Sequence, residues 1–270
     1  MKNAAESKRI VKKTYGDIAK DSMVKANGEG CCGPTSCCGP DLGVNFADDY
    51  RGLEGYAPEA DLGLGCGLPV PIAGIREGDT VLDLGSGAGN DVFVARSLVG
   101  DEGRVIGVDM TEDMVTLARE NAAMLGADNA EFHLGEIEAM PLPDGEVDVV
   151  VSNCVLNLVP DKEKAFGEIL RVLRPGGHFC ISDIVLEGEL PPELAEAAAL
   201  YSGCVSGAMQ KDDYLAVIDA AGFEDVEVKA AKEIVLPDAV ILEAAGEEGL
   251  AAWRDRAVRI LSLTITGHKS

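Results

Sequence analysis

The spacing of hydrophobic residues divides the chain into two parts. In the first part, residues 4–24 carry apolar side chains at helical intervals and predict an amphipathic helix. The Gly- and Cys-rich stretch 26–45 predicts a loop, and a short helix is expected at 48–53. From about residue 70 onward, short apolar runs alternate with helical patterns, which indicates a different architecture.

The second part predicts a sheet of buried strands. Each strand is a short apolar run that is bounded by glycine or by polar turn residues. In chain order the strands are 79–85, 104–110, 130–135, 146–153, 177–185, 223–231 and 259–267. Helices are predicted at 91–99, 112–125, 162–173, 192–201, 212–221 and 239–258. Because strands that alternate with helices form right-handed βαβ units, we expect an α/β fold with a doubly wound, mostly parallel sheet.

Composition narrows the possible partners. The 270 residues are 47% hydrophobic, as in an ordinary globular protein. The formal net charge is −24, so the surface would repel nucleic acid and anionic lipid. No apolar run reaches the ~20 residues that a membrane-spanning helix needs, and no secretory signal is evident. We therefore expect a cytoplasmic protein with no membrane or nucleic-acid partner, and a monomer by default.

A glycine-rich loop follows the first predicted strand. The stretch "VLDLGSGAGND" places Gly85, Gly87 and Gly89 between a strand and a helix, where glycine lets the backbone approach a ligand closely. Asp109 ends the second strand, where an acid can accept hydrogen bonds from ribose hydroxyls. The spacing fits a dinucleotide or S-adenosylmethionine. The GxGxG form, and the lack of a basic residue in the loop to meet a pyrophosphate, favour S-adenosylmethionine.

Two further strand ends are expected at the same crevice. Ligands of doubly wound sheets lie beyond the carboxyl ends of the strands. Residues 135–138 follow the third predicted strand, and residues 152–154 end the fourth. Both segments should therefore line the crevice together with the glycine-rich loop.

The eight cysteines are the second chemical signal. In a cytosolic chain of this size, reactive thiols or ligands are a better interpretation than a disulfide scaffold. Cys154 ends a strand at the crevice, and Cys66 lies in a glycine-rich loop before the first strand. Cys204 lies after the fifth strand, in a region that can fold over the crevice. Cys180, in the middle of a strand pattern, is expected to be a core residue.

These motifs resemble those of the arsenite S-adenosylmethionine methyltransferases, over residues 11–228. The resemblance rests on "DLGLGCG", "VLDLGSGAGND", "VIGVDMT", "GEIEAMPLPD", "SNCVLNL", "EILRVLRPGG" and "CVSGA". It implies a class I Rossmann-like methyltransferase fold with C-terminal additions. The S-adenosylmethionine-binding domain is expected at 70–270, with an active-site cover at 187–210. The preceding segment, 1–69, is helical and Cys-rich and is expected to contribute to the arsenic site.

The resemblance also implies an activity and its residues. The protein would methylate arsenite, or thiol-conjugated arsenite, for detoxification, with S-adenosylmethionine as the methyl donor. The implied arsenic-binding thiolates are Cys66, Cys154 and Cys204, which suits trivalent arsenic because a soft centre prefers thiolate sulfur. The implied cofactor contacts are Asp83, Gly85, Ser86, Gly87, Gly89, Asp109, Met110, Ile137, Glu138 and Asn153.

The motif "CCGPTSCC" at 31–38 leaves several roles open. The resemblance implies a fourth catalytic cysteine that pairs with Cys66 during reductive turnover, and we assign this role to Cys38, with Cys37 close behind. A thiol reductant, thioredoxin or glutathione, would then be a co-substrate, and thioredoxin a partner. The vicinal cysteines at 31–32 and 37–38 could instead capture arsenite or accept disulfide exchange. A zinc site and an inert loop are the remaining alternatives.

Two other functions compete with arsenic methylation. One is methylation of a different small molecule, in which the cysteines are incidental. The other is sequestration of a metalloid without turnover. The glycine-rich loop and Asp109 argue against sequestration, because such a protein has no use for a methyl donor.

Overall fold

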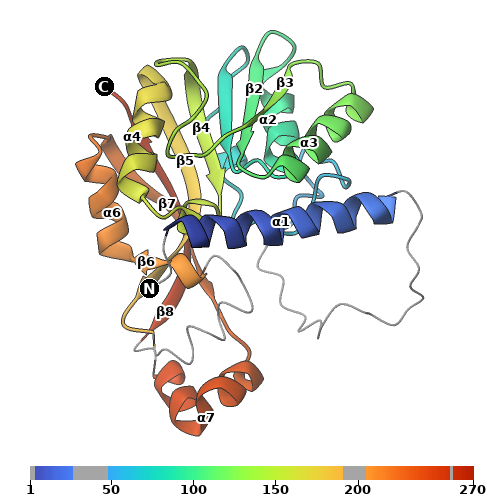
Figure 1. The fold of residues 1–270 in the computed structure, drawn as a ribbon. Coiled ribbons are helices and arrows are strands. Elements are labelled where there is room, and N and C mark those ends of the chain that lie inside the picture. The colour runs from blue at the N-terminus through green and yellow to red at the C-terminus, as the bar shows by residue number, and fades with distance from the viewer. Residues whose placement is uncertain (1–3, 27–47, 191–204, 256–257) are drawn as a thin grey trace.

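The structure is a computed structural model that describes residues 4–26, 48–190, 205–255 and 258–270 (Figure 1). The helices are α1 (Ala4–Ala26), α2 (Asn90–Val99), α3 (Glu112–Leu125), α4 (Lys162–Val172), α6 (Lys211–Ala220) and α7 (Asp238–Arg254). The strands are β1 (Thr80–Leu84), β2 (Arg104–Asp109), β3 (Ala130–Leu134), β4 (Val147–Asn153), β5 (Leu173–Glu187), β6 (Met209–Gln210), β7 (Glu224–Ile234) and β8 (Arg259–His268). Single 3-10 turns are η1 (Val70–Ile72), η2 (Leu156–Leu158) and η3 (Val205–Gly207).

The strands form one mixed sheet. Its order is β3-β2-β1-β4-β5-β8-β7, and the short β6 pairs with β5. Strands β1 to β5 run parallel, whereas β8 runs antiparallel to both of its neighbours. The predicted α/β fold with a doubly wound, mostly parallel sheet is therefore confirmed.

Alternating side chains of the central strands build a core on each face of the sheet. In β1, Leu82 packs into a cluster with Phe166 of α4 and Tyr214 of α6. The neighbouring Val81 points to the other face, into a cluster that contains Phe93 of α2. Helices accordingly lie on both sides of the sheet (Figure 1). Burial on both faces explains why these strands read as continuous apolar runs.

The C-terminal strands extend beyond the rest of the sheet. Figure 1 shows that β8 extends past α1 and that α7 lies beyond this end of the sheet. A third apolar cluster fills this region, and α7 contributes Ile241 and Leu250 to it. The same cluster contains Cys66 and Cys154, so the C-terminal additions pack directly around two of the predicted arsenic ligands.

Most predicted elements are present, but the short helix at 48–53 was a wrong prediction. The chain makes turns there, beginning with a bond from the Leu53 amide to the Tyr50 carbonyl. At Gly55 the φ angle is +82°, and a Cβ atom would lie 2.3 Å from the Phe93 carbonyl oxygen. The chain therefore also turns tightly against α2 at Gly55, two residues beyond the predicted helix. The predicted helix 192–201 lies outside the described residues.

No helix in the described parts of the chain combines the length and the apolar character that a bilayer-spanning segment requires.

A buried carboxyl group joins α6 to the sheet. Asp183 of β5 is 1% exposed, and its side chain accepts hydrogen bonds from the Tyr214 hydroxyl at 3.2 Å and from the Ile184 amide at 3.0 Å. Burial raises the pKa of Asp183 to about 7, although these hydrogen bonds oppose the shift. The folded protein therefore holds this proton more tightly than the unfolded chain does.

This difference makes the stability of the fold depend on pH. An aspartate in an unfolded chain has a pKa of about 4. Between that value and the folded pKa of about 7, the folded state retains a proton that the unfolded state has lost. The contribution of Asp183 to the free energy of unfolding therefore falls as pH rises through this window and is constant above it.

We expect Asp183→Asn to gain stability relative to the wild type as pH rises, because asparagine has no proton to lose. Urea unfolding at about pH 5, 6, 7 and 8 measures the difference between the two proteins. A difference that does not change across this range would show that Asp183 is already ionised in the folded protein at the lowest pH.

Candidate functional site

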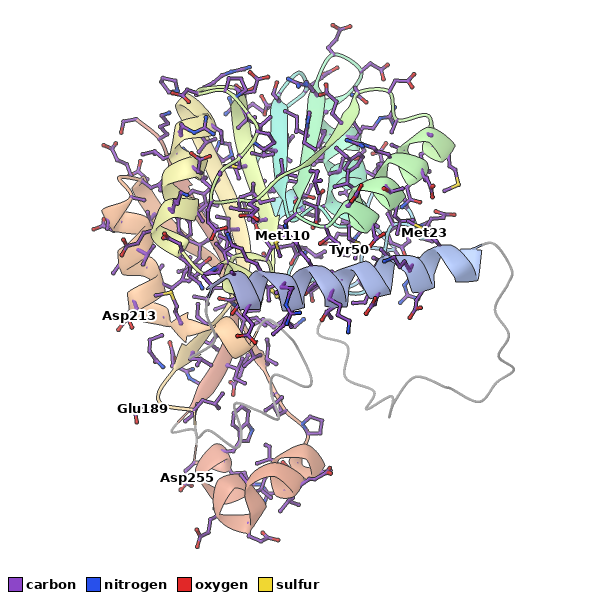
Figure 2. The ribbon with its side chains drawn as sticks, in the orientation of Figure 1. Met23, Tyr50, Met110, Glu189, Asp213 and Asp255 are labelled. Carbon is purple, nitrogen blue, oxygen red and sulfur yellow. The ribbon has the colours of Figure 1, made fainter. Side chains whose placement is uncertain are left out.

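A cavity lies beyond the carboxyl ends of the parallel strands. It holds about 1120 Å³ of empty space, part of which is open solvent. Residues that follow β1, β2, β3 and β4 line it, together with the α1 side chains Lys8, Val11 and Tyr15. Figure 2 shows Met110 and Tyr50 beside α1, at the ends of the strands. The cavity is thus at the edge of the sheet where the sequence predicted a ligand.

The glycine-rich loop forms one wall of the cavity. Gly85 has φ +66°, and a Cβ atom there would lie 2.4 Å from the Val155 side chain. Only glycine tolerates both the left-handed conformation and this close approach. The loop is tied to the end of β2 by a hydrogen bond of 3.1 Å from the Gly87 amide to Asp109 Oδ2. The Thr111 amide donates to the other Asp109 oxygen at 2.8 Å.

Two polar atoms of this wall are buried and have no hydrogen-bond partner in the protein. They are Ser86 Oγ and Asn90 Oδ1, and both residues line the cavity. A buried polar atom without a partner costs free energy, so such atoms mark a place where a polar ligand completes the hydrogen bonding. The loop therefore fits a polar cofactor that has several hydrogen-bonding groups.

The cavity is strongly acidic. Burial and the neighbouring carboxylates of Asp91 and Asp109 raise the pKa of Asp83 well above its usual range. Burial also raises the pKa of Asp91, to about 6. Among the described residues that line the cavity, Lys8 is the only lysine or arginine. Such a cavity suits the cationic sulfonium and amino groups of S-adenosylmethionine and would repel the pyrophosphate of a dinucleotide.

Helix α1 lies across the carboxyl ends of the parallel strands (Figure 1), and its side chains cover part of the cavity. Lys8 Nζ lies 2.8 Å from a carboxylate oxygen of Glu136 and 2.8 Å from one of Glu138. Lys12 adds a weaker contact to Glu136 at 3.4 Å. The basic face of α1 thus binds the acidic loop after β3, and a cofactor in this cavity would lie beneath the helix.

Cys154 stands in a strained position at the edge of the cavity. It follows β4 directly, lines the cavity and is 4% exposed. Its φ angle is +63°, a left-handed conformation that is rare for residues other than glycine. Strain of this kind persists where the surrounding structure imposes it, and it is found most often at functional sites. The Cys154 amide donates a hydrogen bond of 2.8 Å to the Ser182 carbonyl.

Cys66 lies beside Cys154 although 87 residues separate it from the end of β4. The Cys66 Sγ atom lies 3.9 Å from the same Ser182 carbonyl oxygen, which therefore contacts both cysteines. Both residues belong to one buried cluster with Ile184, Ile234 and other apolar side chains. The structure thus brings together two of the three predicted arsenic ligands in surroundings that exclude water.

The remaining cysteines divide into two groups. Cys180 is fully buried, its thiol donates to the Pro69 carbonyl at 3.3 Å, and burial raises its pKa to about 12, as expected for a core residue. Cys204, Cys38 and the other cysteines of 31–38 lie outside the described residues. Within the residues that are described, no group of three or more His, Cys, Asp or Glu side chains could hold a metal ion.

The predicted cofactor contacts line the cavity, with one exception. Gly89 is absent from the cavity wall and instead caps α2 with φ +99°, where a Cβ atom would lie 2.8 Å from the Phe93 ring. The sequence reasoning missed Lys8, Tyr50 and Asn90, which do line the cavity. Asn90 follows the glycine loop and could have been found there. Lys8 and Tyr50 reach the cavity only through tertiary packing.

Known methyltransferases resemble this chain in sequence. The family described as "Methyltransferase domain" matches residues 75–222. An arsenite methyltransferase of Halobacterium salinarum is 42% identical over 98% of this chain and 67% of its own length. The human arsenite methyltransferase is 38% identical over 59% of this chain and 44% of its own length.

A solved structure shows the same relationship. An arsenic(III) S-adenosylmethionine methyltransferase from Chlamydomonas reinhardtii superimposes with a TM-score of 0.64 at 38% identity, over 75% of this chain and 66% of the other. The present chain thus spans about two thirds of the halobacterial and algal proteins and less than half of the human one. The cofactor of this fold is S-adenosylmethionine, and the chain belongs to the family of S-adenosylmethionine-dependent arsenite methyltransferases.

Proposed function

We propose that this chain methylates trivalent arsenic that is held by the thiolates of Cys66, Cys154 and Cys204. The observation that carries the proposal is the burial of Cys66 and Cys154 in one apolar cluster at the border of the cofactor cavity. Two cysteines that serve only as core residues would have no reason to meet at this border. Nor would a core cysteine require the left-handed backbone of Cys154.

Support for the third thiolate comes from the residues that follow it. Val205 is 5% exposed and packs in the cluster that contains Cys66 and Cys154. At Gly207 a Cβ atom would lie 1.9 Å from the Asn157 carbonyl oxygen, so η3 packs tightly against η2, just after Cys154. Cys204 immediately precedes Val205 in the sequence. The wider cover at 187–210 is part of the same proposal.

The chemistry follows from the ligand set. Three thiolates hold As(III) in a pyramidal geometry and leave its lone pair free. Bound S-adenosylmethionine supplies an electrophilic methyl group on a sulfonium sulfur. The arsenic lone pair forms the new As–C bond, the C–S bond breaks with its electron pair going to sulfur, and arsenic is formally oxidised by two electrons. The task of the cysteines is to hold the lone pair in line with the methyl group.

The oxidised arsenic must then be reduced before the product leaves. Two protein thiols can supply the two electrons by forming a disulfide, which thioredoxin or glutathione would reduce in turn. We propose Cys38 as the partner of Cys66 in this step. The electrons balance because each disulfide returns one arsenic centre to the trivalent state.

The first prediction separates arsenic methylation from its alternatives. We expect purified protein with a dithiol to form S-adenosylhomocysteine only when arsenite is present. Cys66→Ser and Cys154→Ser should each lower this rate by about a hundredfold or more, because misplacing a reacting group has costs of that size. Chromatographic separation of the arsenic species identifies the product.

Cys180→Ser is the matched control for these variants, since it replaces a buried cysteine outside the site and keeps a hydrogen-bond donor for Pro69. It should retain the wild-type rate. Arsenite binding without turnover would instead support sequestration. Full activity of Cys66→Ser and Cys154→Ser on a different acceptor would support another small-molecule methyltransferase.

The second prediction tests the strain at Cys154. Because the residue has a φ of +63°, glycine should fit this position better than serine does. We expect Cys154→Gly to be more stable than Cys154→Ser by about 1 kcal/mol, although neither variant binds arsenic normally. Urea unfolding measures this difference.

The same pair of substitutions at Cys180, in the interior of β5, is the control. There the order should reverse, because glycine weakens a strand interior. Equal stability of the two Cys154 variants would show that the backbone at this position stores no strain.

A further inference from the structure

A single amide side chain holds the backbone on both sides of Cys66. Asn153, the last residue of β4, accepts hydrogen bonds at Oδ1 from the Cys66 amide at 3.0 Å and from the Gly67 amide at 3.3 Å. Its Nδ2 donates to the Gly67 carbonyl at 2.9 Å. Since Asn153 immediately precedes Cys154, the residue that grips one thiol-bearing loop is covalently joined to the other thiol-bearing residue.

The glycines on either side of Cys66 make this grip possible. A Cβ atom at Gly65 would lie 2.7 Å from Asn153 Nδ2. A Cβ atom at Gly67 would lie 2.6 Å from Ser182 Oγ. Neither contact is tolerable, so the "GCG" sequence is required for the loop to approach β4 and β5 this closely.

Tyr50 fixes the orientation of the Asn153 amide. The Tyr50 ring is buried, and its hydroxyl donates to Asp91 Oδ1 at 2.8 Å and accepts from Asn153 Nδ2 at 2.7 Å. Asn153 Nδ2 also lies 3.2 Å from Asp91 Oδ2. A flipped amide would place Nδ2 against the Cys66 and Gly67 N–H groups and Oδ1 against the Gly67 carbonyl and the Asp91 carboxylate, and so would lose the hydrogen bonds to all of these groups.

These contacts use the full hydrogen-bonding capacity of the side chain. The carbonyl oxygen has two lone pairs and receives two N–H groups, and the NH₂ group has two hydrogens for three nearby acceptors. No polar atom of the Asn153 side chain is left to bind the cofactor. This differs from the role that the resemblance implied, in which Asn153 is a cofactor contact.

We propose that Asn153, oriented by Tyr50, is a positioning residue that sets the Cys66 thiol at the correct distance from Cys154 for arsenic. The inference rests on the proposed function, because it assumes that both thiols bind the same arsenic atom. Three sulfur ligands bind one centre well only if the protein holds them in place beforehand, and supporting side chains supply that rigidity. Asn153 supplies this rigidity to the Cys66 loop, which comes from the N-terminal segment and not from the sheet.

The test uses two substitutions that leave every cysteine intact. Tyr50→Phe removes one oxygen atom and so releases Asn153 Nδ2 and Asp91 without opening a cavity. Asn153→Ala removes all the side-chain hydrogen bonds to the Cys66 and Gly67 backbone. We expect arsenite affinity to weaken about tenfold in Tyr50→Phe and more in Asn153→Ala, while the affinity for S-adenosylhomocysteine stays within about twofold of the wild type.

The control is Asn129→Ala, which removes another amide that donates to two backbone carbonyls, those of Gly100 and Gly103, away from the cavity. Asn129→Ala should lower the melting temperature without changing arsenite affinity. A role in general stability would give the same pattern for Tyr50→Phe and Asn153→Ala. A positioning role is therefore identified when Tyr50→Phe and Asn153→Ala weaken arsenite binding but leave the affinity for S-adenosylhomocysteine unchanged, whereas Asn129→Ala lowers only the melting temperature.

Arsenite binding can be followed through Trp253. It is the only tryptophan of the chain, and it packs against the cluster that contains Cys66 and Cys154. Titration of each protein with sodium arsenite, monitored by tryptophan emission and repeated by calorimetry, gives the dissociation constants. Calorimetric titration with S-adenosylhomocysteine gives the cofactor affinities.

The outcomes distinguish failure of the proposal from failure of the proposed function. If Cys66→Ser binds arsenite as tightly as the wild type, the thiolate site itself is wrong, and the positioning role falls with it. If Cys66→Ser fails to bind but Tyr50→Phe and Asn153→Ala bind normally, only the positioning role is overturned. An equal loss of arsenite and S-adenosylhomocysteine affinity in Asn153→Ala would also overturn it, since Asn153 would then act through the cofactor.

Discussion

The parallel alignment of β1, β2 and β4 is the constraint on which the whole site depends. It delivers the glycine loop, Asp109 and the Asn153–Cys154 pair to one edge of the sheet, although they are far apart in sequence. Helices on both faces bury these strands and fix their register. The glycine loop, Asp109 and Cys154 are therefore held close together by rigid strand ends, with only the Cys66 loop added from outside the sheet.

Charge and polarity differ sharply between the two halves of the site. The cofactor half is lined by carboxylates, several of them buried, and contains polar atoms that a ligand would satisfy. The thiol half is surrounded by aliphatic side chains from the C-terminal strands and α7. An acidic half suits a cation, and the apolar half keeps the side chains of Cys66 and Cys154 largely out of contact with water. The Asn153 side chain stands at the boundary and contacts both halves.

The parts of the molecule that could be predicted from sequence are those with local signals. Periodicity and glycine placement predicted the sheet, the loop after β1 and the burial of Cys180. The Cys66 loop could be assigned a function only by resemblance, because its position depends on a hydrogen-bond network between residues 87 apart. Tyr50 and Lys8 carry no local signal at all. The turn at Gly55 was missed because its cause is the nearby backbone of α2.

The N-terminal segment is attached to the domain at two points, and the four cysteines of 31–38 lie between them. On one side α1 buries Ala19 and pairs Lys20 with Asp113 at 3.0 Å. On the other side the chain is fixed again at Tyr50. Whatever path residues 27–47 take, both ends of this span are held, and a chain reaches at most ~3.6 Å per residue. If one of these thiols reacts with Cys66, as the proposed function requires, the reaction is intramolecular, and its rate depends on an effective local concentration and not on diffusion from solution.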